Sequence, residues 1–431
     1  MKSNKASLRF DYSLYVFLYY LCNGADNIKR HRKEKLIFIS YLMISVTLWV
    51  FRSKLFGAKD IVFGTALFKI QSFTIAALLI LGVPILLFIL GIPKMALKIS
   101  KALRRIGFCN SAGEYPILIR TNIDKDDKDY AFLEFDNMGI PVSEFEDHKD
   151  ELATSMNRHI CFIMPGKDNT RVLMRTITGA KQIPDFYFWE EDLPQDEATL
   201  VLGKTISENL YMNLNNIPHV LIGGSTGSGK TEILQWLLYQ NIKHGHKVIV
   251  ADFKTIDFNG PWKKKTVRTF NLEEFKKLLV KTILELDRRK QLFNEVDVVK
   301  LSEYNEKFPE VKLKRIIVAC DEVAEILDKT GKSKEAKAQI DEVIALLSTI
   351  ARLGRAFGIH LFLATQRPDA TILPGQIKNN IDMRICGRAD DVLSQIILDS
   401  TAAKDAIPKY CPGRFITNED IIFQAPKFNF Q

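Results

Sequence analysis

The residues best suited to chemistry form a glycine-rich loop near the middle of the chain. The loop matches the pattern GxxxxGK[ST] and follows the apolar run 220–222. Its residues are Gly224, Ser225, Thr226, Gly227, Ser228, Gly229, Lys230 and Thr231. Glycines let backbone N–H groups converge on phosphate oxygens, and the N-terminus of a following helix adds partial positive charge. The spacing predicts a nucleotide-phosphate loop, with Lys230 on the β- and γ-phosphates and the Thr231 hydroxyl on Mg²⁺.

A pair of acids predicts the catalytic half of the same site. The apolar run 316–320 is followed by Asp321 and Glu322. We expect Asp321 to bind Mg²⁺ through water and Glu322 to orient and deprotonate the attacking water, which makes the site a hydrolase. Two alternatives stay open. A kinase would use an acceptor hydroxyl in place of water, and two acids can also simply begin a solvated helix.

A third apolar run predicts a strand that ends beside the phosphates. It covers 358–368 and contains Gln366, a polar residue placed to sense the γ-phosphate. His360, near its start, is better explained as a satisfied structural histidine than as a catalytic one. Another predicted strand, KVIVADFK (247–254), ends in Asp252 and Lys254, and Asp252 is expected to cap the following turn. Strands separated by helical segments imply an open, mostly parallel α/β sheet with its ligand at the carboxyl ends.

Composition limits the class of protein around this site. The 431 residues are 47% hydrophobic and 26% charged, which excludes a disordered or collagen-like chain, and the length suggests two to three domains. The net charge of +9 is too modest to identify a partner. The six cysteines are scattered without a CxxC pair, which argues against a disulfide framework or a structural zinc site and favours a reducing compartment.

Two uncharged stretches predict a membrane anchor within residues 1–108. The stretch 70–93 is long enough to cross a bilayer. The stretch 36–51 is shorter, and it can span the bilayer if the long side chains of its flanking Lys and Arg reach out to the membrane surface. A buried helix of a soluble domain is the alternative for each. Because Lys and Arg cluster before the first and after the second span, both ends are expected in the cytoplasm.

The flanks of this anchor carry further signals. The aromatic-rich stretch 12–22 is a poor signal peptide, because a basic cluster stands where cleavage residues belong. We interpret it as interfacial or as packed against the anchor. Residues 94–108 alternate basic and apolar positions at helical spacing, which predicts a helix on the anionic inner leaflet or a solvated linker helix.

Between anchor and phosphate loop, residues 109–195 change to short β-rich runs separated by charged turns. They predict a small α+β domain without assignable chemistry. The acidic loop 124–129 lacks the glycine and terminal glutamate of a calcium loop, so a solvated turn is favoured. The nucleotide-binding domain then spans 196–431.

The stretch 200–423 resembles the ATPase motor of the FtsK/SpoIIIE translocases. The matching blocks are VLGK, IPHVLIGGSTGSGKT, ADFK, ELDRR, YNEK, VACDE, ARLGRAFGIHLFLATQRPDA and IKNNIDMRI. The resemblance implies a RecA-like P-loop motor that uses ATP and Mg²⁺ and assembles as a hexameric ring around double-stranded DNA. Nucleotide then lies between subunits, and Arg355 and Arg384 match arginines of the family pattern that are candidates to reach a neighbour's γ-phosphate.

Departures from the family pattern narrow the expected role. The chain ends at Gln431, without room for a winged-helix DNA-reading module, and it has two predicted spans where the division proteins have four. After Leu398 and Asp399 the usual glycine-containing turn is replaced by STAAKDAI. These features resemble a coupling ATPase of Gram-positive conjugative elements, anchored in the cytoplasmic membrane as a multi-pass protein. It would deliver DNA, with a relaxase and channel proteins as partners.

Contact with DNA has only indirect support in the sequence. The basic loop 262–265 with Arg268 combines an aromatic residue with cations. Further positive charge comes from Lys281, Arg288, Arg289 and Lys290. Cations that neutralise phosphates without reading bases suit a translocase and predict salt-sensitive binding, whereas a solvated basic face is the alternative.

Three other functions stay open. A related ATPase could power protein secretion, although those enzymes carry several motors in tandem and this chain has one phosphate loop. A translocase for chromosome or plasmid partitioning would use the same motor. A membrane scaffold could use nucleotide only to gate assembly, which the intact Lys230, Thr231, Asp321 and Glu322 disfavour.

Overall fold

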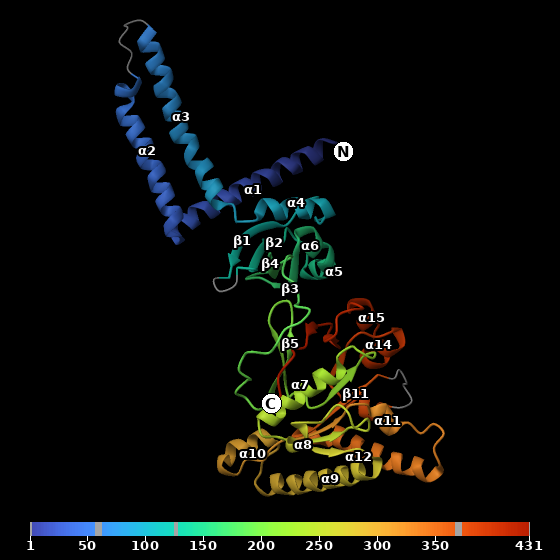
Figure 1. Cartoon of the computed structure of the whole chain (residues 1–431). Helices are drawn as coiled ribbons and strands as arrows, with labels where there is room; N and C mark the ends of the chain where they lie inside the picture. The colour runs from blue at the N-terminus through green and yellow to red at the C-terminus, as the bar shows by residue number, and fades with distance from the viewer. Residues whose placement is uncertain (1, 57–62, 125–127, 367–372, 431) are drawn as a thin grey trace. The chain divides into compact units, whose positions relative to one another are not determined.

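A computed structural model describes residues 2–56, 63–124, 128–366 and 373–430. The chain divides into two compact units, Met1–Lys181 and Gln182–Gln431 (Figure 1). The predicted limits at 108 and 195 stay a prediction. Parts of three expected features lie outside the described residues: 57–62 of the loop between the spans, 125–127 of the acidic turn, and 367–368 of the third-strand run.

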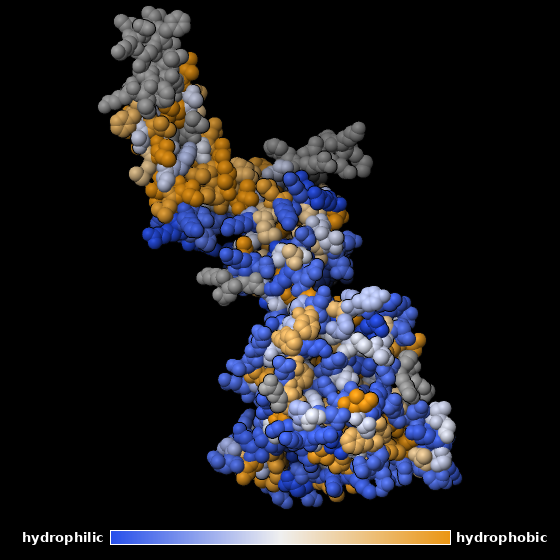
Figure 2. All heavy atoms as spheres, viewed as in Figure 1, coloured by the Kyte–Doolittle hydropathy of each residue, from blue (hydrophilic) through white to orange (hydrophobic). Residues whose placement is uncertain are grey.

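The first unit begins with four helices: α1 (Lys2–Arg30), α2 (Arg32–Phe56), α3 (Phe63–Gly91) and α4 (Ala96–Ile106). Two windows, Arg32–Phe51 in α2 and Ser72–Gly91 in α3, are long and apolar enough to cross a membrane, with mean hydropathies of 1.6 and 2.9. Their large apolar side chains face outward, as the orange surface along α2 and α3 shows (Figure 2). The windows overlap the two predicted spans, and by length and composition alone they are compatible with them.

Helix α1 contains the aromatic stretch 12–22 and packs along α3. Asn23 Nδ2 donates to the Gly91 carbonyl at 2.6 Å, and Asn27 Nδ2 donates to the Leu90 carbonyl at 2.9 Å. The Tyr12 hydroxyl donates to the Tyr115 carbonyl at 2.9 Å, so α1 also contacts the segment that leads into the first strand. Within the stretch itself, the Phe17 ring stacks on Phe88 of α3 with centroids 5.0 Å apart, which agrees with the interpretation of the stretch as packed against the anchor.

A small α+β domain completes this unit. Its elements are β1 (Ile117–Ile123), β2 (Tyr130–Asp136), α5 (Val142–Asp147), α6 (Lys149–Met156), β3 (Arg158–Pro165) and β4 (Arg171–Thr178). The strands form an antiparallel sheet in the order β1-β2-β4-β3. On one face of α4, Ile99 and Leu103 are buried in the same core as Leu133 and Phe135. Because this face covers the sheet, α4 is part of the small domain and not a solvated linker helix. Contact of its exposed basic side with the inner leaflet stays a prediction.

The second unit is built on one large mixed sheet. Within its described residues the strands are β5 (Thr199–Lys204), β6 (Asn209–Asn213), β7 (Val220–Gly223), β8 (Lys247–Ala251), β9 (Val267–Thr269), β10 (Ile316–Cys320), β11 (Ile359–Thr365), β12 (Met383–Cys386), β13 (Arg414–Thr417) and β14 (Ile422–Gln424). Their order is β6-β5-β14-β13-β12-β7-β11-β10-β8-β9. The part from β12 to β9 is parallel, and the strands on the other side of β12 pair antiparallel.

Helices cover both faces of this sheet. They are α7 (Lys230–Lys243), α8 (Trp262–Lys265), α9 (Leu272–Glu295), α10 (Leu301–Lys307), α11 (Val323–Leu327), α12 (Lys334–Phe357), α13 (Gly375–Lys378), α14 (Asp391–Leu398) and α15 (Ala402–Ala406). Figure 1 shows α9 and α12 together on one side of the sheet and α7 on the other. Strand residues alternate between two cores: Val220 and Ile222 pack with α7, and Leu221 packs with α9 and α12. This burial on both faces explains the continuous apolar strands.

The strand order brings the predicted motifs together. Strand β11 lies between β7, which precedes the phosphate loop, and β10, which precedes Asp321 and Glu322. All three strands are parallel, so their carboxyl ends meet at one edge of the sheet. The expected open, mostly parallel α/β arrangement therefore places three separate sequence segments at a single site.

Candidate active site

The loop between β7 and α7 adopts backbone conformations that require glycine. Gly227 and Gly229 have φ of 76° and 96°, in the left-handed region that residues with a Cβ rarely adopt. A Cβ at Gly229 would also lie 2.8 Å from the Gly413 nitrogen. Lys230 Nζ donates to the carbonyl oxygens of Gly224 at 2.7 Å and Ser225 at 3.4 Å. The ammonium is thus held over the loop, at the first residue of α7, where the helix N-terminus favours anions.

The metal-binding pair predicted from sequence forms a direct contact. The Thr231 hydroxyl donates to Asp321 Oδ1 at 3.0 Å, although the two residues are far apart in the chain. Burial raises the pKa of Asp321 to about 6, and the nearby carboxylates of Asp257 and Asp252 act in the same direction. A hydroxyl and a carboxylate, with other acids close by, are the oxygen donors that Mg²⁺ prefers. These residues fit the ion, which would neutralise phosphate charge there.

Glu322 is oriented by the strand next to its own. The Thr365 hydroxyl donates to Glu322 Oε1 at 2.8 Å, and the Gln366 backbone N–H donates to Oε2 at 3.1 Å. Burial raises the pKa of Glu322, while these two hydrogen bonds oppose the rise. A buried, oriented carboxylate with a raised pKa is suited to accept a proton from water.

Gln366 connects the end of β11 to the phosphate loop. The Thr226 hydroxyl donates to Gln366 Oε1 at 3.1 Å. Both residues line a cavity of about 320 Å³. The other residues around it are Gly227, Gly229, Lys230, Thr231, Glu232, Gln235, Lys254, Asp257 and Asp321. The structure therefore gathers the loop, the metal-binding acid and the predicted sensor around one cavity.

Sequence reasoning missed several members of this site. Lys254 and Asp257 line the cavity from the turn after β8, and Gln235 Nε2 donates to the Asp257 carbonyl at 2.6 Å. Burial raises the pKa of Asp257. The rule that ligands bind at the carboxyl ends of parallel strands could have found Lys254, because it follows the apolar run 247–251. Asp252 itself caps that turn by accepting from the Thr255 N–H at 3.0 Å, as predicted.

Arg388 forms hydrogen bonds with the phosphate loop, and no sequence motif predicted this role. It follows β12, and its carbonyl accepts from the Ser225 N–H at 2.7 Å. Its guanidinium donates to the Lys409 carbonyl at 3.0 Å and the Thr226 carbonyl at 3.4 Å. The segment around Lys409 and the loop are thereby held together through one side chain.

The two arginines predicted to act between subunits lie away from the cavity in the described chain. Arg355 is near the end of α12, which leads into the amino end of β11, and its Nε donates to the Asn215 carbonyl at 3.1 Å. Arg384 pairs with the carboxylate of Asp399. Neither lines the cavity. A role toward a neighbouring subunit's nucleotide stays a prediction for both.

Two of the residues expected to contact DNA are structural. Trp262 is buried, so its ring is not available to a nucleic-acid base. Arg289 is 3% exposed, and its guanidinium donates to Glu285 and to the carbonyls of Phe357 and Lys314. In contrast, Lys263, Lys264 and Lys265 are exposed on α8, which is a helical turn and not the loop expected.

His360 is a satisfied structural histidine, as expected. It is fully buried, with Nδ1 2.9 Å from the Pro218 carbonyl and Nε2 3.1 Å from Arg315 Nη1. Cys320 is also buried, and burial raises the pKa of its thiol. Neither group lines the cavity that holds the phosphate loop.

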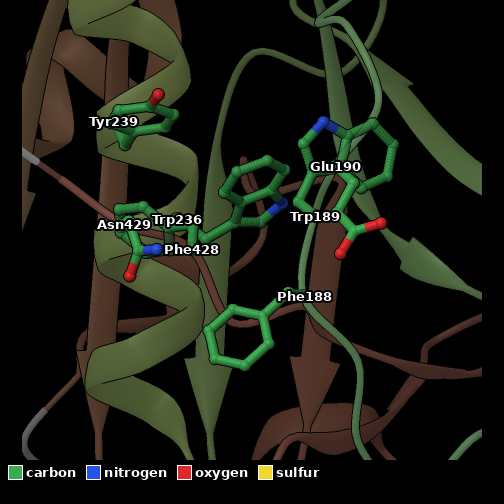
Figure 3. A pocket seen from close by; sticks show the side chains of 7 residues that line it. All are labelled: Phe188, Trp189, Glu190, Trp236, Tyr239, Phe428 and Asn429. Carbon is green, nitrogen blue, oxygen red and sulfur yellow. The ribbon is translucent and has the colours of Figure 1, made fainter.

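An aromatic cluster fixes the helix that carries Lys230 and Thr231. Figure 3 shows Trp236 projecting from α7 toward the segment that carries Phe188 and Trp189, with Tyr239 on the same helix. The rings of Trp189 and Trp236 lie 5.4 Å apart. The Trp236 indole N–H donates to the Val201 carbonyl at 2.7 Å. This flank of α7 borders a second cavity of about 310 Å³, and its packing holds the phosphate-loop helix against the sheet.

Comparison with known proteins identifies the domain. Residues 189–370 match the model of the FtsK/SpoIIIE family. A solved structure of the pCW3 conjugation coupling protein TcpA, in a monomer form with ATPγS, is 35% identical to this chain. The alignment covers 78% of this chain and 96% of that one, with a TM-score of 0.57.

The chain belongs to the FtsK/SpoIIIE family. Curated members with detectable similarity include the DNA translocase FtsK of Caldanaerobacter subterraneus subsp. tengcongensis, 30% identical over 63% of this chain and 39% of that protein. The DNA translocase FtsK of Helicobacter pylori is 33% identical over 54% of this chain and 26% of that protein. The chain spans well under half the length of these two relatives.

Family membership confirms three predictions. The second unit has the α/β P-loop fold of an FtsK/SpoIIIE ATPase, the domain is an ATPase, and ATP is its nucleotide. The residues that line the cavity all fall within the matched stretch 189–370.

Proposed function

We propose that this protein is a membrane-anchored, ATP-driven DNA translocase that acts as a coupling protein and delivers DNA to a conjugative transfer channel. The observation that carries the proposal is a set of hydrogen bonds at the phosphate loop. Asp321 and Gln366 each bond to a loop threonine, and the Gln366 N–H bonds to Glu322. The conjugative role is supported by the 35% identity to TcpA, which is a conjugation coupling protein, across nearly all of that chain.

Each residue of the site has a defined part in hydrolysis. The loop amides and Lys230 bind the ATP phosphates, and Thr231 and Asp321 hold Mg²⁺, which supplies charge neutralisation. Glu322 positions the attacking water and takes its proton. Because Gln366 touches both the Glu322 carboxylate, through its N–H, and Thr226 of the loop, it relays the state of the γ-phosphate to the catalytic carboxylate.

The translocating form is a homo-hexamer with nucleotide between subunits. Arg355 and Arg384 do not line the cavity of their own subunit, and we assign them to the nucleotide of a neighbouring copy. The exposed lysines of α8 contact DNA phosphates without reading bases. A relaxase and channel proteins are the other partners of this role.

The helices α2 and α3 anchor the protein in the cytoplasmic membrane. Both contain windows of sufficient length and hydropathy. Basic residues before the first and after the second window favour both ends in the cytoplasm, which leaves the motor in that compartment.

The test is the ATPase rate of the full chain in detergent, measured without DNA and with duplex or single-stranded DNA. We expect DNA to stimulate hydrolysis several-fold. Lys230→Ala should abolish nucleotide binding, and Glu322→Gln should keep binding but stop turnover. Lys243→Ala, which changes an exposed lysine of the same helix, is the control.

Two results would contradict the proposal. Hydrolysis that no DNA changes, but that a secreted peptide stimulates, would favour a protein-secretion motor. Unchanged turnover in Glu322→Gln would remove the role assigned to that carboxylate.

A further inference from the structure

A groove lies where α1, the end of α3, α4 and the start of β1 meet in the first unit. Its volume is about 250 Å³. Each helix contributes side chains at helical spacing, for example Val16 and Tyr20 from α1 and Leu97, Ser100 and Arg104 from α4. The groove is therefore a feature of how these elements pack.

The lining contains both apolar and polar side chains. Val16, Phe88, Ile92 and Leu97 form much of the apolar part, and Leu97 is 70% exposed although it lies on a helix with a well-packed inner face. The polar lining residues include Ser13, Ser100 and Arg104. Tyr12 and Tyr20 also line the groove, and their hydroxyls donate to backbone carbonyls. No acidic residue is among the described residues that line the groove. Such a groove matches an anion that carries a long apolar chain.

Arg104 is available to an anion. Its guanidinium lies over the Tyr115 ring at 5.7 Å from the ring centroid, and within the described residues it forms no ion pair. Three more cations, Lys98, Lys101 and Arg105, are exposed on α4. The charge of this helix is thus positive on every side that the small sheet does not cover, which complements an anionic headgroup.

The groove is continuous with the apolar surface of a candidate span. The window Ser72–Gly91 ends between Phe88 and Ile92, which both line the groove. If α3 crosses the membrane, its last turn brings the groove to the depth of the headgroups. The positive-inside rule puts this end on the cytoplasmic side, where anionic lipids are recognised by basic clusters next to a span.

We propose that this groove binds one anionic phospholipid, with an acyl chain along Leu97 and Phe88 and the headgroup phosphate on Arg104 and Ser100. The inference rests on the membrane anchoring proposed above. Because α4 and β1 belong to the core of the small domain, an occupied groove fixes that domain to its anchor. The bound lipid thus connects the small domain to the helices that anchor the protein in the membrane.

The test uses the full chain in nanodiscs of phosphatidylcholine that contain a photo-crosslinking phosphatidylglycerol. Crosslinked peptides are mapped by mass spectrometry. We expect labelling within 12–20 and 97–104, reduced about tenfold in Arg104→Gln and in Leu97→Asn. Arg105→Gln, an exposed arginine next in sequence that does not line the groove, should label like the wild type. Circular dichroism of each variant checks folding.

Several outcomes would overturn the proposal. An equal loss in Arg104→Gln and Arg105→Gln would indicate diffuse charge attraction, and equal labelling by a phosphatidylcholine analogue would indicate an apolar cleft without headgroup selection. Labelling confined to α2 and α3 would indicate bulk lipid only. A chain that fails to co-elute with the nanodiscs contradicts the anchor and the lipid site together, whereas insertion without groove labelling contradicts the lipid site alone.

Discussion

The Thr365 hydroxyl donates a 2.8 Å hydrogen bond to Glu322, although 43 residues separate them in the chain. Thr365 is the last residue of β11, and Glu322 follows the neighbouring strand β10 with one residue between. The contact fixes the carboxylate on the strand that also delivers Gln366 to the phosphate loop. It ties the orientation of the proposed base to the position of the proposed sensor.

Removing this hydroxyl should therefore slow hydrolysis and leave ATP binding intact. For Thr365→Val we expect a turnover about tenfold lower, since a hydrogen bond to a charged group contributes roughly 1.5–3 kcal/mol. Steady-state ATPase assays and equilibrium nucleotide binding measure the two quantities. Thr365→Ser should keep most activity, and Thr349→Val, at a half-buried threonine on α12 that does not line the cavity, is the control. Equal losses in binding and turnover would show a purely structural role.

Arg388 should matter for nucleotide affinity. Its side chain joins the Thr226 carbonyl of the loop to the Lys409 carbonyl, so Arg388→Ala loosens the loop without removing a group that contacts phosphate in the proposed mechanism. We expect ATP to bind several-fold more weakly, as titration of a fluorescent nucleotide analogue would measure. The matched control is Arg352→Ala, at an exposed arginine of α12. Unchanged affinity in Arg388→Ala would mean that the loop keeps its shape unaided.

Glu285 should make stability depend on acidity. Hydrogen bonds from Arg288 and Arg289 lower the pKa of Glu285 from 4.5 to about 2. The folded state favours the carboxylate, so this stabilisation is complete above pH 4.5 and is lost as the pH falls toward 2. Glu285→Gln should unfold more easily at neutral pH, by on the order of 2 kcal/mol, and less so in acid.

Urea unfolding followed by tryptophan fluorescence measures this effect. Trp189, Trp236 and Trp262 all lie in the unit that contains Glu285. Glu273→Gln, which alters an exposed ion pair on the same helix, should change little. A difference between Glu285→Gln and wild type that stays constant from neutral pH to pH 2 would contradict the linkage.

The lysines of α8 should set the salt dependence of DNA binding. Each phosphate contact adds about 0.9 to the slope of log affinity against log salt for duplex DNA. Replacing Lys263, Lys264 and Lys265 together by alanine should lower that slope by up to about three and weaken all sequences alike. Fluorescence anisotropy across a salt series measures it. The control replaces Lys334 and Lys337, two exposed lysines of α12. An unaltered slope would move the DNA contacts elsewhere on the motor.

The local sequence was sufficient to predict the part of the site whose residues follow one another in the chain. The phosphate loop, its preceding strand and its following helix occupy one uninterrupted segment, because consecutive N–H groups must surround the phosphates. Asp321 and Glu322 could be recognised because apolar strands that are buried on both faces stand out from the acids that end them. Gln366 was predicted for the same reason.

Contacts that depend on packing could not be predicted in this way. The burial of Arg289 follows from the meeting of α9 with the carbonyls of Phe357 and Lys314, and the burial of Trp262 from a short helix packed on the second core. Both residues have types common in DNA-binding surfaces, and residue type alone carries no information about exposure.

The amino-acid sequence by itself determined the P-loop ATPase family of this protein, since phosphate binding and the strands beside it are encoded at short range. Only the tertiary structure decided that Arg388 braces the loop, that Thr365 orients Glu322, and that α4 lies on the small sheet with a groove at its edge. These relationships depend on strand order and helix packing, which arise from burial of side chains far apart in the chain.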